Sequence, residues 1–144
     1  MIAAIRQGRA RRAAPALLAV LAATACGAPS ADLFVVHRSG SGRNAKLTLL
    51  VQDDGSVVCN GGKPRPITSR QLLDARQLAR DLGAQAELNL ALPARPGAVL
   101  RYRVRLEAGS VSFADTSRPL PRSFSELQLF TTTIGEQVCG LSRQ

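Results

Sequence analysis

The sequence predicts an α+β fold in which one antiparallel sheet carries two helices on a single face. Several short segments alternate between apolar and polar residues, which is the period of a strand, and two longer segments have apolar residues three and four apart, which is the period of a helix. Asp-Gly and Ala-Gly turns separate successive strands and indicate hairpins. The order strand, strand, helix occurs twice after a first strand, so we expect two ββα-like units plus an N-terminal strand.

The first 25 residues are organised like a secretory signal peptide. Four arginines and no acidic residue lie within the first twelve positions, and an uncharged segment rich in Ala, Leu and Val follows from Ala13 to Ala25. Such a segment is typical of a signal peptide and too short to span a bilayer stably. We therefore expect export, with residues 26–32 (CGAPSAD) forming a short flexible tether.

The apolar segment ends in Ala23-Thr24-Ala25-Cys26-Gly27, which is similar to the lipobox of bacterial lipoproteins. In that family the Cys is acylated and becomes the new N-terminus. The lipobox usually has Leu where this chain has Ala23, and Ala23-Thr24-Ala25 also fits ordinary cleavage after an A-x-A motif. Three cysteines outside the cytoplasm would leave one thiol unpaired, and acylation of Cys26 would remove it. The sequence favours a lipid anchor on the outer face of the cytoplasmic membrane, with secretion as the alternative.

A single domain is expected over residues 33–144. Its first strand covers residues 33–36, and a flexible turn follows over residues 39–44. Residues 46–52 alternate in polarity and predict a second strand. After the Asp53-Asp54-Gly55 turn, a third strand runs through Val57 and Cys59.

Capping signals place the two helices. Thr68 and Gln71 form a predicted capping box that begins the first helix, and Gly83 ends it. A short strand over residues 87–92 and a hairpin formed by residues 99–106 and 110–114 come next. Ser123 and Glu126 predict a second capping box, and the second helix ends at Cys139-Gly140. The apolar stripes expected to face the sheet are Leu72, Ala75, Ala79 and Leu82 in the first helix, and Leu127, Phe130, Ile134 and Val138 in the second.

The two halves of the domain echo each other. Gly55-Ser56-Val57 precedes two prolines and a helix, and Gly109-Ser110-Val111 does the same 54 residues later. Duplication of one ββα unit explains this echo, and so does repeated use of the same turn and cap chemistry.

Cys59 and Cys139 are predicted to form a structural disulfide that joins the last helix to the sheet. Their separation is 80 residues, for which the chain-entropy estimate of stabilisation is about 4 to 5 kcal/mol. A redox-active pair usually has close spacing such as C-x-x-C, which is absent.

Composition argues against several functions. Residues 26–144 carry fifteen basic and ten acidic residues, a net charge of +5, but one Tyr and four Phe provide no row of stacking aromatics, so nucleic-acid binding is not expected. With one His in the chain, no metal, cofactor or catalytic residue is predicted. His37 near Ser39 and Ser41 leaves a small secreted hydrolase as an alternative, although no G-x-S-x-G motif accompanies it. Asp53 and Asp54 are interpreted as turn residues.

Arg101, Arg103 and Arg105 are the candidate binding residues. Strict alternation in the segment Arg101-Tyr102-Arg103-Val104-Arg105-Leu106 directs the three guanidinium groups to one face. If the helices cover the apolar face, this row lies on the open one, where steps of about 7 Å suit phosphate or carboxylate groups. The alternative is an ordinary exposed strand whose long polar side chains lie opposite Ser110 and Ser112.

Two family resemblances follow from these features. The whole chain has seventeen Arg against two Lys and much Ala, and residues 26–144 resemble small exported lipoproteins of GC-rich Gram-positive bacteria, which implies a location rather than an activity. The order of strand, Cys-bearing strand, Pro-preceded helix, hairpin and Cys-ending helix is similar to the secreted subtilisin-inhibitor family. In that family a rigid sheet presents a protease-binding loop, and Cys59 and Cys139 would correspond to one Cys of each of its two disulfides. Residues 91–96 would be the loop, without a Cys to brace it, and Arg95 its protease-facing residue.

Together these features favour a non-enzymatic, lipid-anchored domain that binds an envelope protein or an anionic envelope component. A secreted protease inhibitor and a small secreted hydrolase are the alternatives.

Overall fold

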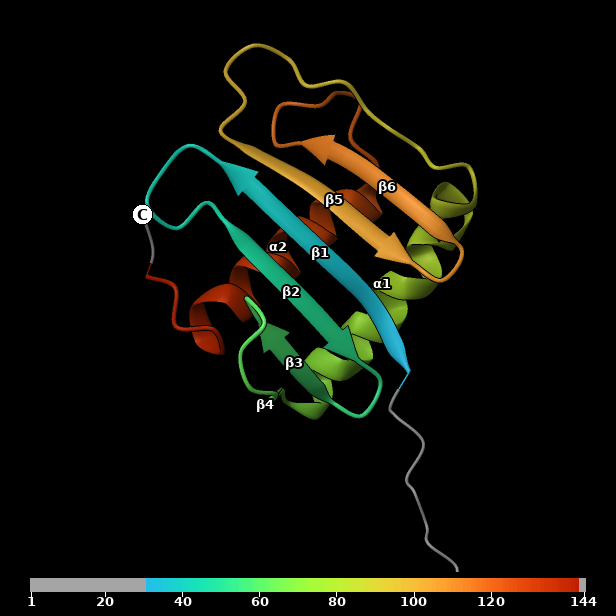
Figure 1. Cartoon of the computed structure of the whole chain (residues 1–144). Coiled ribbons are helices and arrows are strands. Elements are labelled where there is room, and N and C mark those ends of the chain that lie inside the picture. The colour runs from blue at the N-terminus through green and yellow to red at the C-terminus, as the bar shows by residue number, and fades with distance from the viewer. Residues whose placement is uncertain (1–30, 143–144) are drawn as a thin grey trace, which may run out of the picture.

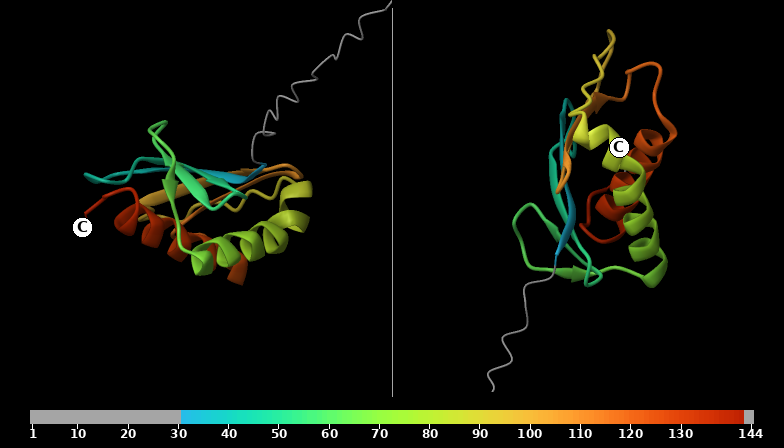
Figure 2. Two further views of the ribbon diagram at one scale, coloured as in Figure 1. Left: turned by 90° about the horizontal axis from the view of Figure 1, so that it is seen from below. Right: turned by 90° about the vertical axis from the view of Figure 1, so that its right-hand side faces the viewer.

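A computed structural model describes residues 31–142, so the predicted signal peptide and Cys26 lie outside the described residues. It confirms the α+β fold: six strands form one antiparallel sheet in the order β4-β3-β2-β1-β5-β6 (Figure 1). Both helices lie on the same side of this sheet (Figure 2). The elements are β1 (Asp32–Gly40), β2 (Leu47–Gln52), β3 (Ser56–Cys59), β4 (Arg65–Pro66), α1 (Ser69–Glu87), β5 (Leu100–Leu106), β6 (Gly109–Ala114) and α2 (Arg122–Gln137).

The N-terminal strand β1 lies in the middle of the sheet, between β2 and β5. It begins at Asp32, one residue inside the segment predicted to be a tether, and it continues to Gly40, beyond the predicted end at Val36. The extension arises because β1 pairs with a strand on each side. Its pairing with β5 runs from Val35, opposite Arg105, to Gly40, opposite Leu100. Two partner strands satisfy backbone groups that the sequence pattern alone assigned to a turn.

The core fills the space between the sheet and the two helices. Every second side chain of β1, β2 and β5 points into it, and α1 and α2 contribute their apolar stripes. Phe113 stacks on both Tyr102 and Phe124, with ring centroids 5.0 and 4.7 Å apart. The residues with the largest fully buried side chains are Phe34, Phe124, Leu47, Leu49, Leu82, Leu127 and Ile134.

The two ββα units have opposite handedness. Strands β2 and β5 are both antiparallel to β1 and therefore run in the same direction. Strand β3 lies on one side of this pair and β6 on the other, while both helices cover one face. No rotation superimposes two units related in this way, so tandem duplication of one ββα unit does not generate this arrangement. What the two halves share is a glycine with positive φ, Gly55 or Gly109, at the turn before the second strand of each unit.

The predicted disulfide between Cys59 and Cys139 is present, with the two Cα atoms 5.7 Å apart. It joins the end of β3 to the residues that follow α2. Because β3 is only four residues long and β4 only two, this edge of the sheet has few backbone hydrogen bonds of its own. The bridge therefore fastens the weaker side of the sheet to the helical layer.

Helix α1 starts where predicted but ends later. Thr68 Oγ1 accepts a hydrogen bond from the Gln71 backbone N–H at 3.2 Å, and Gln71 Oε1 accepts one from the Thr68 N–H at 2.9 Å. The expected end at Gly83 is wrong, because the buried stripe continues to Ala86. Asn89, at φ 48°, supplies the left-handed residue that follows the helix.

The hairpin between β5 and β6 packs tightly against the end of α1. A Cβ atom at Gly109 would lie 2.1 Å from the carbonyl oxygen of Ala86, so only glycine fits there. Asn89 Oδ1 accepts a hydrogen bond from the Ser110 N–H at 3.1 Å. The strand predicted over residues 87–92 is wrong, because α1 occupies its start and only Ala91 forms an isolated bridge, to Ser112 of β6.

Helix α2 does not use the predicted second capping box. It begins at Arg122 after Pro121, which makes no side-chain capping hydrogen bond, and Ser123 is buried within the first turn. Glu126 pairs instead with Arg122, with 2.6 Å between Oε1 and Nε. Proline fixes φ in advance and so begins the helix without a side-chain cap.

Candidate functional site

The face of the sheet that the helices leave uncovered, which we call the open face, is the candidate functional site. Its side chains alternate along each strand with the buried core residues, so the same backbone that builds the core also directs them outward. The segment between β3 and β4 rises on this side of the sheet in both views of Figure 2. The outward residues are Asp32, Val35, His37, Ser39, Thr48, Leu50, Gln52, Ser56, Val58, Arg101, Arg103, Arg105, Ser110 and Ser112.

Arg101, Arg103 and Arg105 form a row along β5 and are all exposed. Each lies between two neighbouring strands: in β1 the register partners are Ser39, His37 and Val35, and in β6 they are Ala114, which is buried, Ser112 and Ser110. Within residues 31–142, these three guanidinium groups make no hydrogen bond or ion pair. Three solvated cations therefore share one strip of surface without a counter-ion from the described residues.

The arginine row lines a shallow concavity of about 790 Å³. Leu92 and Ala94, in the chain segment that passes the β6 edge, form its outer border. His37 and Ser39 line it from β1, and Ser110 and Ser112 line it from β6. The concavity therefore combines exposed cations with hydroxyl groups, which is a donor set suited to phosphate or carboxylate oxygens.

No carboxylate lies among the register partners of the arginine row on β1 and β6, whereas Asp32, at the start of β1, faces the open side as the partner of Gln52. All ten Asp and Glu residues of the chain fall in the described part, and they sit on the helices, at turns or at the start of β1. The arginine row is therefore a positive strip on this face, although the chain carries acidic residues elsewhere. Fixed charges of one sign on one surface attract ligands of the other sign and raise their rate of association.

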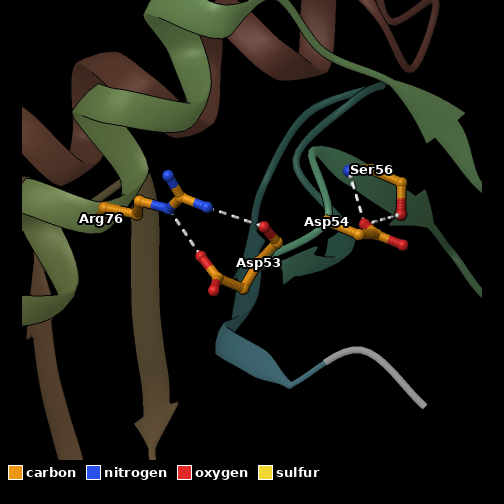
Figure 3. Close-up of polar contacts among 4 residues, drawn as sticks. All are labelled: Asp53, Asp54, Ser56 and Arg76. Carbon is orange, nitrogen blue, oxygen red and sulfur yellow. Dashed lines mark hydrogen bonds and ion pairs between the residues drawn. The ribbon is translucent and has the colours of Figure 1, made fainter. Parts of the chain in front are cut away.

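The acidic pair at the β2–β3 turn has structural partners (Figure 3). Arg76 of α1 donates two hydrogen bonds to Asp53: Nε donates to the carboxylate Oδ1 at 2.6 Å, and Nη2 donates to the backbone carbonyl oxygen at 3.1 Å. Asp54 Oδ1 accepts hydrogen bonds from the Ser56 backbone N–H at 2.9 Å and from its Oγ at 2.7 Å. The pair thus ties the turn to α1. Within residues 31–142, no group of three or more His, Cys, Asp or Glu side chains could hold a metal ion.

His37 lies on the open face beside the arginine row. Its Nδ1 is 3.3 Å from Thr48 Oγ1 on β2, and its register partner on the other side is Arg103. Ser39 follows it on the same face of β1. A nucleophilic serine needs a base oriented by a third group, and within residues 31–142 the side-chain hydrogen bond of His37 is to the Thr48 hydroxyl.

The segment that contains Arg95 is exposed and braced without a disulfide. The Arg95 N–H donates to Thr116 Oγ1 at 3.0 Å, and this hydroxyl donates to the Arg95 carbonyl oxygen at 2.9 Å. Ser117 Oγ donates to the Pro93 carbonyl oxygen at 2.9 Å. The backbone N–H and the carbonyl oxygen of Arg95 are therefore both bonded to Thr116, while the Arg95 side chain is exposed to solvent.

Sequence reasoning missed one buried cation, Arg38. It exposes 9% of its surface and donates through Nε to the Ala45 carbonyl oxygen at 3.1 Å and through Nη2 to that of Asn44 at 2.9 Å. Burial raises the pKa of nearby Tyr102 above its ordinary value of 10.0, and the positive charge of Arg38 acts in the opposite direction. Arg38 alternates with buried Phe34 and Val36 in β1, so the alternation of the strand could have predicted that this cation is enclosed. Its two hydrogen bonds hold the loop between β1 and β2.

The chain matches no protein-family model, no curated protein and no solved structure. No enzyme family is therefore associated with it. Neither α1 nor α2, the two helices of residues 31–142, is long and apolar enough to cross a membrane.

Proposed function

We propose that this chain is a non-enzymatic binding module of the cell envelope that recognises an anionic partner through the open face of its sheet. The observation that carries the proposal is the row of Arg101, Arg103 and Arg105, which is exposed, makes no ion pair with residues 31–142 and has no carboxylate among its register partners. Arginines that serve only solubility can be scattered over the whole surface. Here three arginines share one strip with hydroxyl groups on both sides, an arrangement that suits a ligand with several negative charges.

A sheet with one face covered by helices also suits this role because it is rigid. The inward residues of β5, Tyr102 and Val104, are fully buried and hold the strand that carries the arginine row. A ligand therefore meets guanidinium groups whose backbone positions are set before binding, and less conformational entropy is lost on association.

Export and lipid anchoring at Cys26 belong to the same proposal and rest on the sequence pattern of residues 1–27. Fractionation tests them: the native chain should remain with membranes and carry an acylated Cys26, and Cys26→Ser should release it from them. A chain that keeps its leader and stays in the cytosol would contradict this part.

The main experiment is co-purification from crosslinked envelopes. The triple variant Arg101→Gln, Arg103→Gln, Arg105→Gln should lose the partners that the native chain captures. A matched control removes the same charge from the helices through Arg70→Gln, Arg80→Gln and Arg122→Gln, and it should retain them. An unchanged set of partners in the first variant would reject the proposal.

A protease inhibitor similar to the subtilisin-inhibitor family is the second candidate, favoured by the exposed loop that Thr116 and Ser117 brace. An inhibitor that mimics a substrate offers its scissile carbonyl to the protease, where the oxygen enters the oxyanion hole. The Arg95 carbonyl instead accepts a hydrogen bond from Thr116, which favours the open face over this loop. Inhibition of trypsin or subtilisin by the purified protein, lost in Arg95→Ala, would establish the second candidate.

A hydrolase is the third candidate and rests on His37 alone. Hydrolysis of ester or amide substrates by the purified protein, abolished by His37→Ala, would establish it in place of the binding module.

A further inference from the structure

The open face holds a second feature beside the arginine row. Val58 of β3, Leu50 of β2 and Val35 of β1 are direct register partners, so their outward side chains form a line across three strands. We call this line the apolar strip. All three side chains are partly exposed to solvent, on the opposite side of the sheet from the core. The solvent side of an antiparallel sheet normally carries polar side chains, so a continuous apolar line there is a surface to be explained.

The apolar strip and the arginine row meet at one corner. Val35, at the end of the strip, is the register partner of Arg105, at the end of the row. A partner that covers both features must place apolar groups next to negative charges. Polyphosphate, a wall polymer rich in phosphate or a layer of lipid headgroups would neutralise the arginines but would leave the strip without apolar contact.

From this junction we infer that the occupant of the open face is a protein segment that carries apolar residues beside carboxylates. This inference rests on the proposed function and names the class of its partner. Protein interfaces combine a desolvated apolar centre with arginine and a polar rim, which is the composition found here. Charge complementarity then favours an acidic segment over a basic one, because the three arginines have no carboxylate among their register partners.

The dimensions of the open face fit such a segment. From β3 to β6 the sheet has four strand intervals, which amounts to about 19 Å at the usual spacing. The raised segment between β3 and β4 borders one side, and the segment with Leu92 and Ala94 borders the other. An α-helix whose axis follows the apolar strip would place residues one turn apart, about 5.4 Å, over strands about 4.8 Å apart, and about 13 of its residues would fit between these borders at about 1.5 Å each.

The test uses four defined probes against the full chain. The first is a helical peptide with three leucines one turn apart and glutamates along one side of them. The second has the same composition with the leucines scrambled, the third is a poly-glutamate peptide of equal charge, and the fourth is polyphosphate. Affinity is measured by titration at two salt concentrations, because screening should weaken the ionic contacts.

We expect the first peptide to bind at least tenfold more tightly than the scrambled peptide. Val35→Thr with Leu50→Thr should remove this difference, and these substitutions keep residues that strands tolerate. The matched control replaces the exposed leucines of the helices, Leu73→Thr with Leu129→Thr, and should leave affinity unchanged. Circular dichroism of each variant confirms that the fold is retained.

The outcomes separate the inference from the proposed function. If all four probes bind equally well and only the triple arginine variant loses them, the face takes any polyanion; the inference fails while the proposed function stands. If the triple arginine variant binds every probe as the native chain does, the proposed function fails as well. Absence of binding by the first peptide above the scrambled one also overturns the inference.

Discussion

The two faces of the sheet are built by the same strands and have opposite chemistry. In β5, Tyr102 and Val104 are buried beneath the helices, while Arg101, Arg103 and Arg105 alternate with them on the open face. The covered face holds stacked aromatic rings, aliphatic side chains and one enclosed cation, Arg38, and the open face has exposed cations, hydroxyls and one apolar strip. The comparison teaches that stability and recognition occupy different sides of one backbone, so each side can be changed without the other.

An arginine placed on the covered face should give the largest change in the free energy of unfolding. Val104→Arg would place an unpaired guanidinium group in the core, where Val104 is 0% exposed, at a cost of about 5 kcal/mol, which is comparable with the stability of a small domain. Ser112→Arg puts the same side chain on the open face and should cost less than about 0.5 kcal/mol. Urea denaturation measures both. Equal losses would show that the two faces are not distinct.

Removing the disulfide should weaken the attachment of the covered face to its helical layer. For the 80 residues between Cys59 and Cys139, the chain-entropy estimate is about 4.5 kcal/mol. Cys59→Ala with Cys139→Ala should therefore lower the free energy of unfolding by most of this amount. A double variant with native stability would mean that α2 is held to the sheet by packing alone.

Substitutions at the first residues of the two helices should change the free energy of unfolding by a smaller amount. Thr68→Ala removes the side-chain cap of α1 and should cost about 1 kcal/mol. Pro121→Ala, at the start of α2, removes no capping hydrogen bond and should cost less. Thermal denaturation checks both variants, and neither should alter ligand affinity at the open face. Reduced affinity in Thr68→Ala would indicate that the helical layer shapes the binding surface.

Tyr102 should give the smallest effect, as a dependence of stability on high pH. Its pKa in the folded chain is raised above 10.0, mainly by burial, so the unfolded chain loses the phenolic proton first. This contribution to stability is complete below about pH 10 and declines as the pH rises through the folded pKa. In denaturation between pH 9 and 11, Tyr102→Phe should lose less stability than the native chain. Parallel pH profiles would contradict this assignment.

The sequence predicted what depends on local periodicity and turn chemistry. The alternation around Arg103, the cap at Thr68 and the Asp53-Asp54-Gly55 turn all have causes within a few residues, and the structure shows each of them. The pairing of Cys59 with Cys139 followed from export and from the lack of another partner after Cys26. This reasoning needed no knowledge of the order of strands.

The errors and omissions have long-range causes. Helix α1 continues past Gly83 because Ala86 packs in the core, and β1 extends to Gly40 because β5 pairs with it. Ser123 and Glu126 resemble a cap, but burial of Ser123 places the first turn earlier. The apolar strip was also invisible in the sequence, because Val35, Leu50 and Val58 become neighbours only through strand register.

The most direct test of recognition by the open face is site-specific photocrosslinking in living cells. A photoreactive residue at Ser112, inside the arginine-lined concavity, is compared with one at Gln77 on the exposed side of α1. We expect crosslinked partners from position 112 only, and we expect their loss when Arg101, Arg103 and Arg105 are replaced by Gln. Crosslinks from position 77 alone, or crosslinks from 112 that survive the arginine substitutions, would contradict the account.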